Sequence, residues 1–120
     1  MDAETQLTQV FSALADPTRR RILSQLATGP ARVGDVAARF DVSAPAISQH
    51  LKVLERAGLV SRTAHAQWRT LSLQTEPLDQ ASAWVDEQRR EWNLRLDALD
   101  AHLATMKAAQ ADDTSQEEPA

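Results

Sequence analysis

The sequence predicts a mainly α-helical domain that contains a helix-turn-helix and a two-stranded β-hairpin and ends in a long helix. Residues 43–58 have the pattern of a capped amphipathic helix, and a shorter helical pattern precedes them. Over residues 69–74, Arg69, Leu71 and Leu73 alternate with Thr70, Ser72 and Gln74, as the two faces of a half-buried strand do. Residues 78–106 repeat apolar side chains at spacings of three, four and seven, which is a helical period.

Two helices are predicted before the helix-turn-helix. Apolar residues at spacings of three and four predict the first over residues 4–15. Asp16 is a good N-cap and Pro17 suits the first helical position, so a second helix begins there and ends before Gly29. The arginines at 19–21 fan around more than half of this second helix. We therefore expect a structural ion pair for at least one of them.

The helix-turn-helix is predicted from residues 33–58. Residues 33–40 form a short helical segment, and residues 41–42 form a tight connection. Ser43 is a good N-cap for the next helix, and Gly58 supplies the left-handed residue that ends it. Two short helices joined by about three residues have the arrangement of a helix-turn-helix. The apolar stripe of the second helix comprises Ile47, Leu51 and Leu54.

The other face of this second helix carries the functional prediction. Pro45, Ser48, Gln49 and Lys52 point away from the apolar stripe. Small hydrogen-bonding side chains with one lysine suit base edges and phosphates in a DNA major groove. An ordinary solvated helix face is the alternative.

A basic hairpin follows the helix. Residues 59–64 and 67–73 are its predicted strands, and His65 and Ala66 connect them. The hairpin carries Arg62, His65, Gln67 and Arg69. A helix-turn-helix followed by such a hairpin is a winged helix-turn-helix, in which the hairpin is the wing. This combination favours DNA binding over the solvated-face alternative.

Composition limits the function classes. The 120 residues are enough for one domain of ordinary size. The chain has no cysteine, which excludes disulfides, thiolate metal sites and a thiol nucleophile. No apolar run reaches membrane-spanning length, and the acidic N-terminus is unlike a signal peptide, so we expect a cytoplasmic protein that does not bind membranes. We expect no enzyme activity, because no nucleophile and base are recognisable.

The charge distribution supports nucleic-acid binding although the net charge is −4. Residues 17–74 carry nine Arg and Lys against three acids, a balance of +6. Residues 1–16 carry −3 and residues 75–120 carry −7. The positive charge therefore coincides with the helix-turn-helix and the hairpin, as phosphate contact requires.

The last helix is predicted to begin near Thr75 and to be a dimerisation helix. It is about 40 Å long at 1.5 Å per residue, which is more than the preceding residues can cover. Its apolar stripe therefore calls for a partner, most simply the same helix of a second copy. Trp84 and Trp92 lining a small-molecule pocket is the alternative. Residues 108–120 are acidic and without periodicity, so we expect a domain over residues 1–107 and a disordered tail.

Two long motifs carry a family resemblance. Residues 10–23, Val-Phe-Ser-Ala-Leu-Ala-Asp-Pro-Thr-Arg-Arg-Arg-Ile-Leu, resemble the opening of the ArsR/SmtB family of bacterial winged-helix repressors. Residues 43–60 resemble its recognition helix, and the match extends from about residue 7 to residue 74. The resemblance implies a homodimer that pairs through its first and last helices. It also implies recognition helices on a palindromic operator, repression of transcription, and release by an effector.

The chain departs from the metal-sensing members of that family. Those members commonly use a cysteine pair on the helix before the recognition helix, and residues 32–40 offer none. Another family site uses Asp-x-His on the last helix, and Asp100 and His102 match its first half. Its second half would fall near Asp113 and Gln116, without a histidine. We therefore expect no metal or other cofactor, and keep a metal-responsive repressor that uses Asp100 and His102 as an alternative.

The combined prediction is a homodimeric repressor, acting also on its own promoter, whose effector is unknown. A winged-helix protein-interaction module that does not bind DNA is the rival hypothesis. Ser48, Gln49 and Pro45 are the leading base-edge candidates, and Lys52, Arg62, Arg69 and Arg19 are the phosphate candidates. The full predicted DNA-binding set is Ser43, Ala44, Pro45, Ala46, Ser48, Gln49, His50, Lys52, Arg62, His65, Gln67 and Arg69. The predicted dimerisation set is Leu7, Val10, Phe11, Val85, Trp92, Leu96, Leu99 and Leu103.

Overall fold

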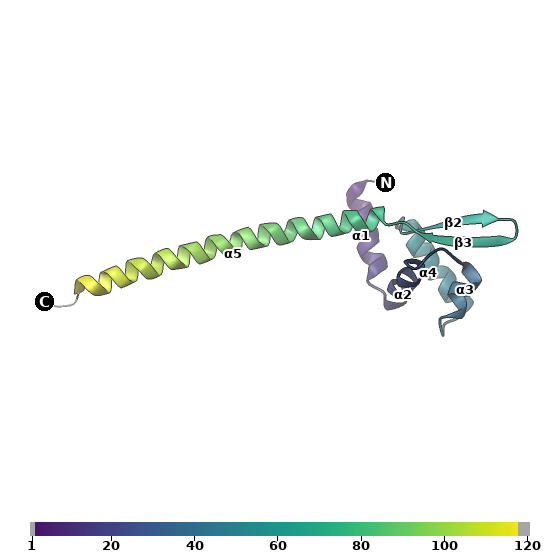
Figure 1. Ribbon diagram of the computed structural model, residues 1–120, viewed down its shortest axis with the longest axis horizontal. Helices are drawn as coiled ribbons and strands as arrows, with labels where there is room; N and C mark the ends of the chain where they lie inside the picture. Colours follow the sequence, from purple (N-terminus) through teal and green to yellow (C-terminus); the bar gives the residue numbers. More distant parts are fainter. Residues whose placement is uncertain (1, 118–120) are drawn as a thin grey trace. The chain divides into compact units, whose positions relative to one another are not determined.

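The computed structural model describes the backbone of residues 2–117 and the surroundings of side chains as far as residue 111. The chain forms two compact units, residues 1–83 and the residues from Trp84 onward. The order of helices and strands confirms the predicted class, a mainly helical winged helix-turn-helix with a long last helix (Figure 1). The elements are α1 (Ala3–Leu14), α2 (Pro17–Leu26), β1 (Ala31–Arg32), α3 (Val33–Ala38), α4 (Ala44–Arg56), β2 (Val60–His65), β3 (Trp68–Leu73) and α5 (Glu76–Glu117).

Side-chain caps begin the helices where the sequence predicts them. The carboxylate of Asp16 accepts hydrogen bonds from the backbone N–H groups of Thr18 (2.8 Å) and Arg19 (3.1 Å). The hydroxyl oxygen of Ser43 accepts from the N–H of Ala46 (3.2 Å). Each cap satisfies donors that the first turn of a helix leaves free. Both predicted N-caps are confirmed.

The small sheet has one more strand than the predicted two-stranded hairpin. Its strand order is β1-β3-β2, and both pairings are antiparallel. Strands β2 and β3 pair from Val60 opposite Leu73 to His65 opposite Trp68. Strand β1 adds two residues, with Arg32 opposite Thr70. A strand of two residues is too short to leave an alternating pattern, which is why the sequence did not predict it.

Two tight turns position the wing. Gly58 has φ +78°, the left-handed conformation predicted for the end of α4. A Cβ there would lie 3.2 Å from the side-chain nitrogen of Gln6, so the position also has little room. The turn at the wing tip contains Ala66 at φ +54°, an uncommon conformation for a residue with a Cβ.

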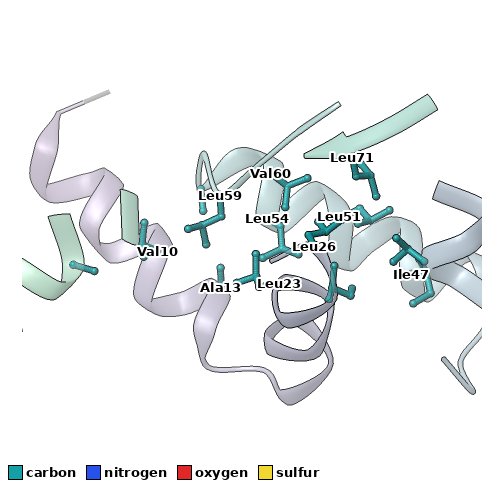
Figure 2. Packing of buried hydrophobic residues seen from close by; sticks show 14 residues of the cluster. Val10, Ala13, Leu23, Leu26, Ile47, Leu51, Leu54, Leu59, Val60 and Leu71 are labelled. Carbon is teal, nitrogen blue, oxygen red and sulfur yellow. The ribbon is translucent and has the colours of Figure 1, made fainter. Parts of the chain in front are cut away.

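One hydrophobic core holds the first unit together (Figure 2). Ile47, Leu51 and Leu54 of α4 are 2%, 1% and 0% exposed, which confirms the predicted stripe. They lie among side chains of α2, β3 and the start of β2, as Figure 2 shows. The buried cluster comprises Val10, Ala13, Ile22, Leu23, Leu26, Val36, Ile47, Leu51, Leu54, Ala57, Leu59, Val60, Leu71 and Ala81.

Helix α5 is one continuous helix, described through Glu117. Every described side chain from Ser82 to Ala111 is exposed. The backbone of residues 108–117 continues the helix where the sequence favours a tail, and residues 118–120 lie outside the described residues. The boundary at residue 107 therefore stays a prediction. None of the helices described is both long and apolar enough to cross a membrane.

Candidate nucleic-acid interface

The outer face of α4 is available to a ligand. Ser48, Gln49 and Lys52 are exposed, whereas Ile47 and Leu51 beside them are buried. The buried stripe fixes the rotation of the helix about its axis, because turning it would bring apolar side chains into water. The three polar side chains are therefore held outward by the core on the opposite face.

The first turn of α4 extends this surface. Ala44 and Pro45 are exposed, and Ala46 is half-buried. Ser43 is exposed as well, and its hydroxyl oxygen caps the helix while its hydroxyl hydrogen is free to rotate towards a ligand. The N-terminal end of a helix attracts phosphate through its free N–H groups and its dipole. Small side chains at this end allow close approach to a nucleic acid.

His50 is half-buried, whereas Ser48 and Gln49 before it are exposed. Its Nδ1 lies 3.3 Å from Nη1 of Arg19 and 4.0 Å from the carboxylate of Asp16. The backbone N–H of Arg19 is the largest cause that lowers the pKa of Asp16, and the charges of His50 and Arg19 lower it further. These contacts join the start of α2 to the recognition helix. They give His50 a structural role that competes with the predicted DNA contact.

Two of the three consecutive arginines cap the end of α1. Arg19 donates from Nε to the carbonyl of Ala13 (2.8 Å) and from Nη2 to that of Ser12 (3.0 Å). Arg20 donates from Nη1 to the carbonyl of Leu14 (2.7 Å). The expected structural role is therefore found, although the acceptors are carbonyl groups rather than carboxylates. Cations at this end also interact favourably with the helix dipole.

The wing carries polar side chains on both of its faces. His65, Gln67 and Arg69 are exposed at and beside its tip, as the sequence predicts. Arg62 is half-buried and forms an ion pair with Glu55 of α4, at 2.8 Å from Nε and 3.4 Å from Nη2. The pair offsets the charge of Arg62, which makes Arg62 a weaker phosphate candidate than Arg69.

Sequence reasoning missed a cation that stacks on the wing. The guanidinium carbon of Arg32 lies 3.9 Å from the centre of the Trp68 ring, within cation–π range. Arg32 lies on β1, opposite Thr70 of β3, and its side chain is exposed. The two stacked residues are far apart in the chain, so no local spacing signals the contact. Arg32 therefore adds a positive charge next to Trp68 of the wing.

The predicted dimerisation residues are not equally available. Val10 is 1% exposed in the chain's own core, and Leu7 is partly buried against it. We therefore remove Val10 from the predicted dimer surface. Phe11 of the same helix is 37% exposed. The α5 members of the set are all exposed: Val85 39%, Trp92 63%, Leu96 42%, Leu99 51% and Leu103 49%.

Two alternatives rest on residues of α5. Trp84 and Trp92 are 45% and 63% exposed, and together with Val85, Gln88 and Arg89 they line an open hollow on the surface of α5. Asp100 and His102 are both exposed on α5. Among the described residues, no three or more His, Cys, Asp and Glu side chains lie together as metal ligands.

The fold and this surface define a class, the winged helix-turn-helix DNA-binding proteins. Residues 16–62 match the family model described as "Bacterial regulatory protein, arsR family". The chain is 39% identical over 79 residues to the transcriptional repressor SdpR of Bacillus subtilis (strain 168), covering 66% of this chain and 88% of that protein. The chain belongs to the ArsR family of DNA-binding transcriptional regulators.

Solved structures agree with this family membership. The crystal structure of the ArsR family transcriptional regulator RHA00566 has a TM-score of 0.72 at 37% identity, covering 77% of this chain and 95% of that one. An ArsR-like transcriptional regulator from Rhodococcus sp. RHA1 has a TM-score of 0.74 at 30% identity, covering 82% and 92%. The similarity therefore includes nearly the whole of both relatives.

Proposed function

We propose that this protein is a homodimeric, sequence-specific repressor that binds a palindromic operator and also represses its own promoter. The exposed polar face of α4, held outward by a fully buried apolar face, is the observation that carries the proposal. A recognition helix reads bases only when its polar side chains reach the groove in a fixed orientation.

Within this proposal, Ser48 and Gln49 read base edges. A glutamine amide can pair with the N6 and N7 atoms of adenine, and a serine hydroxyl can donate or accept. The first turn of α4 supplies apolar contacts to thymine methyl groups through Ala44, Pro45 and Ala46. Small apolar side chains suit such contacts because they do not hold the backbone away from the groove.

The proposed phosphate contacts are cations that, among the described residues, contact neither a carboxylate nor a ring nitrogen. Lys52 and Arg69 are exposed and match this description. Arg62 is left out because it pairs with Glu55. Arg19 and His50 are left out because the ring nitrogen of His50 contacts Arg19 and the carboxylate of Asp16. His65 and Gln67 remain proposed contacts at the wing tip, and Ser43 at the helix start.

Repression and dimerisation are supported less directly. The relative SdpR is named a transcriptional repressor, and a repressor role is consistent with the 39% identity to it. The exposed apolar side chains of α5 support a homodimer, because a stripe of that length in water favours association. A metal-responsive repressor is not favoured by any observation on Asp100 and His102.

Selection from a pool of random DNA duplexes tests this function and identifies the operator in the same experiment. We expect enrichment of a palindrome whose half-sites lie about one helical turn apart. Log affinity for the enriched duplex should fall with log salt, by roughly 0.9 per phosphate contacted. Footprinting on the protein's own upstream DNA then tests autorepression.

Two variants make the selection interpretable. Gln49→Ala should weaken binding to the enriched duplex, whereas Arg90→Ala, on an exposed position of α5, should leave it unchanged. Failure to enrich any sequence, together with affinity that does not depend on salt, would contradict the proposal and favour the protein-interaction module.

A further inference from the structure

One face of the small sheet brings a cation, an aromatic ring and an imidazole together. Trp68 of β3 lies opposite His65 of β2. Arg32 of β1 lies opposite Thr70, which is two residues after Trp68. Residues that are opposite each other, or two apart in one strand, share a face of a sheet. Arg32, Trp68 and His65 therefore lie on one face, and all three are exposed.

The stack on Trp68 restrains the Arg32 side chain before any ligand binds. The guanidinium carbon of Arg32 lies 3.9 Å from the centre of the Trp68 ring. Stacking occupies the flat face of a guanidinium and leaves its N–H donors free for oxygen acceptors. Among the described residues, the Arg32 side chain forms no hydrogen bond or ion pair. Its charge is therefore restrained in position and still available to an anion.

A hollow of about 300 Å³ lies beside this stack, between the start of α3 and the wing. Arg32, Trp68 and Arg69 line it, and Asp35 of α3 contributes the carboxylate of the lining. Two guanidinium groups against one carboxylate leave a positive balance, which attracts an anion. The fork of N–H donors on an arginine matches the oxygen atoms of a phosphate.

We propose that Arg32, positioned by Trp68, binds a backbone phosphate of the DNA duplex at this hollow. This inference rests on the proposed function and adds to it a contact from β1, outside both the helix-turn-helix and the hairpin. Arg32 is the phosphate-binding residue, and Trp68 is a positioning residue because it acts through Arg32. The turn of the hairpin projects past α3 (Figure 1), so this part of the wing is accessible to a duplex.

A phosphate of DNA fits this surface better than a free phosphate does. Exposed polar side chains continue from the hollow to the wing tip, where His65 and Gln67 lie. An extended polyanion can contact the hollow and the tip at the same time, whereas a free phosphate occupies the hollow alone. Contacts to phosphate carry no sequence information. We therefore expect Arg32 to contribute equally to the binding of operator and random DNA.

Titrations of the full chain with the enriched duplex and a random duplex test the contact. Arg32→Ala should weaken binding to both by the same factor, and should reduce the slope of log affinity against log salt by about 0.9. Arg32→Lys keeps the charge and should keep the slope. Arg39→Ala removes an exposed arginine that does not line the hollow, and should also leave the slope unchanged. An unchanged slope for Arg32→Ala would overturn the inference.

A double-mutant cycle tests the positioning role of Trp68. Trp68→Ala should weaken binding to both duplexes severalfold, because Arg32 keeps its charge and loses its restraint. Arg32→Ala should then weaken binding less in the Trp68→Ala background than in wild type. Additive losses in DNA affinity would show that Trp68 does not act through Arg32. Circular dichroism of each variant checks that the affinities refer to folded protein.

The carboxylate in the hollow provides a test in the opposite direction. Asp35→Asn removes a negative charge from the lining, so it should strengthen binding to both duplexes. Asp41→Asn removes an exposed carboxylate that does not line the hollow, and should strengthen binding less. Equal effects of the two substitutions would overturn the assignment of the phosphate to this hollow.

Two further comparisons separate this inference from its alternatives. Replacing chloride by inorganic phosphate at matched ionic strength should weaken wild type and Arg32→Ala equally. A loss confined to wild type would identify free phosphate as the ligand of the hollow and overturn the inference. Selection of an operator by wild-type protein tests the proposed function separately. A chain that enriches a palindrome but keeps its salt slope in Arg32→Ala contradicts the Arg32 contact alone.

Discussion

Helix α4 and the part of α5 from Trp84 onward carry the same kind of apolar stripe and bury it to opposite extents. Leu51 and Leu54 of α4 are 1% and 0% exposed, whereas Trp92 and Leu99 of α5 are 63% and 51% exposed. Both helices repeat apolar residues at spacings of three and four. The period therefore predicts that one face of a helix will be covered, and it does not identify the chain that covers it.

The difference has a practical consequence for mutations. A change on the α4 stripe acts on the folding of one chain, since its neighbours are side chains of the same unit. A change on the α5 stripe leaves that core intact and acts on association, if the proposed dimer is correct. Substitutions on the two helices can therefore separate these two kinds of effect.

Leu51→Ala should cause the largest loss of stability. Removing a fully buried leucine costs about 2–5 kcal/mol through lost transfer free energy and the cavity left behind. Chemical denaturation followed by circular dichroism measures this free energy of unfolding. Leu94→Ala is the matched control, because Leu94 is 69% exposed on α5 and should change it by less than about 0.5 kcal/mol. Equal effects of the two substitutions would contradict the comparison.

Leu99→Asp should dissociate the proposed dimer while leaving helix content in place. A carboxylate on the apolar stripe of α5 would lose its hydration without gaining a partner, so we expect the dimer dissociation constant to rise at least about a hundredfold. Sedimentation at micromolar protein measures association. Leu94→Asp places the same charge on the same helix but outside its apolar stripe, so this variant should remain dimeric. A Leu99→Asp protein that stays dimeric would locate the dimer surface elsewhere, for example along α1.

Gln49→Ala and Lys52→Ala should separate base reading from phosphate contact on the exposed face of α4. Loss of a base-reading glutamine should reduce discrimination between operator and random DNA by about 1–3 kcal/mol. Lys52→Ala should weaken binding to both DNAs alike and flatten the salt dependence. Titrations against both duplexes at several salt concentrations measure the two effects. An unchanged specificity ratio for Gln49→Ala would rule out its base-reading role.

Asp16→Ala should cost about 0.5–2 kcal/mol of stability through the lost N-cap. The backbone N–H of Arg19 holds the pKa of Asp16 below its ordinary value of 3.8. The contribution of the charge is therefore complete above pH 3.8 and is lost as the pH falls through the lower folded value. Asp16→Asn keeps a capping oxygen without the charge, so its unfolding free energy should fall less steeply on acidification. Identical acid profiles would contradict this role of the charge.

The smallest expected effect concerns the stack between Arg32 and Trp68. Cation–π contacts at exposed sites contribute about 0.5–1 kcal/mol. Arg32→Ala should lower stability by that amount in wild type and by less in a Trp68→Ala background. Arg39→Ala removes an exposed arginine for comparison. Additive effects of Arg32→Ala and Trp68→Ala would show that the contact contributes no stability.

Local signals in the sequence predicted much of the fold. Asp16, Ser43 and Gly58 act within one helical turn of their own positions, so the sequence around them is sufficient to recognise them. The contacts that sequence reasoning missed join residues that are distant or on different elements. Glu55 and Arg62 meet across a turn, and Arg32 and Trp68 meet only because β1 pairs with β3. The sequence shows which residues are charged and which face of a helix or strand they occupy. Only the folded structure shows which of these cations already contact a carboxylate or an aromatic ring.

The ion pair between Glu55 and Arg62 has a further consequence for how the molecule meets its ligand. It links the recognition helix to the first strand of the wing, on either side of the turn at Gly58. The pair therefore restrains the helix and the wing relative to each other before DNA binds. Surfaces that are ordered in advance lose less conformational entropy on binding. The pair thus favours affinity through preorganisation, although neither of its charges needs to touch the nucleic acid.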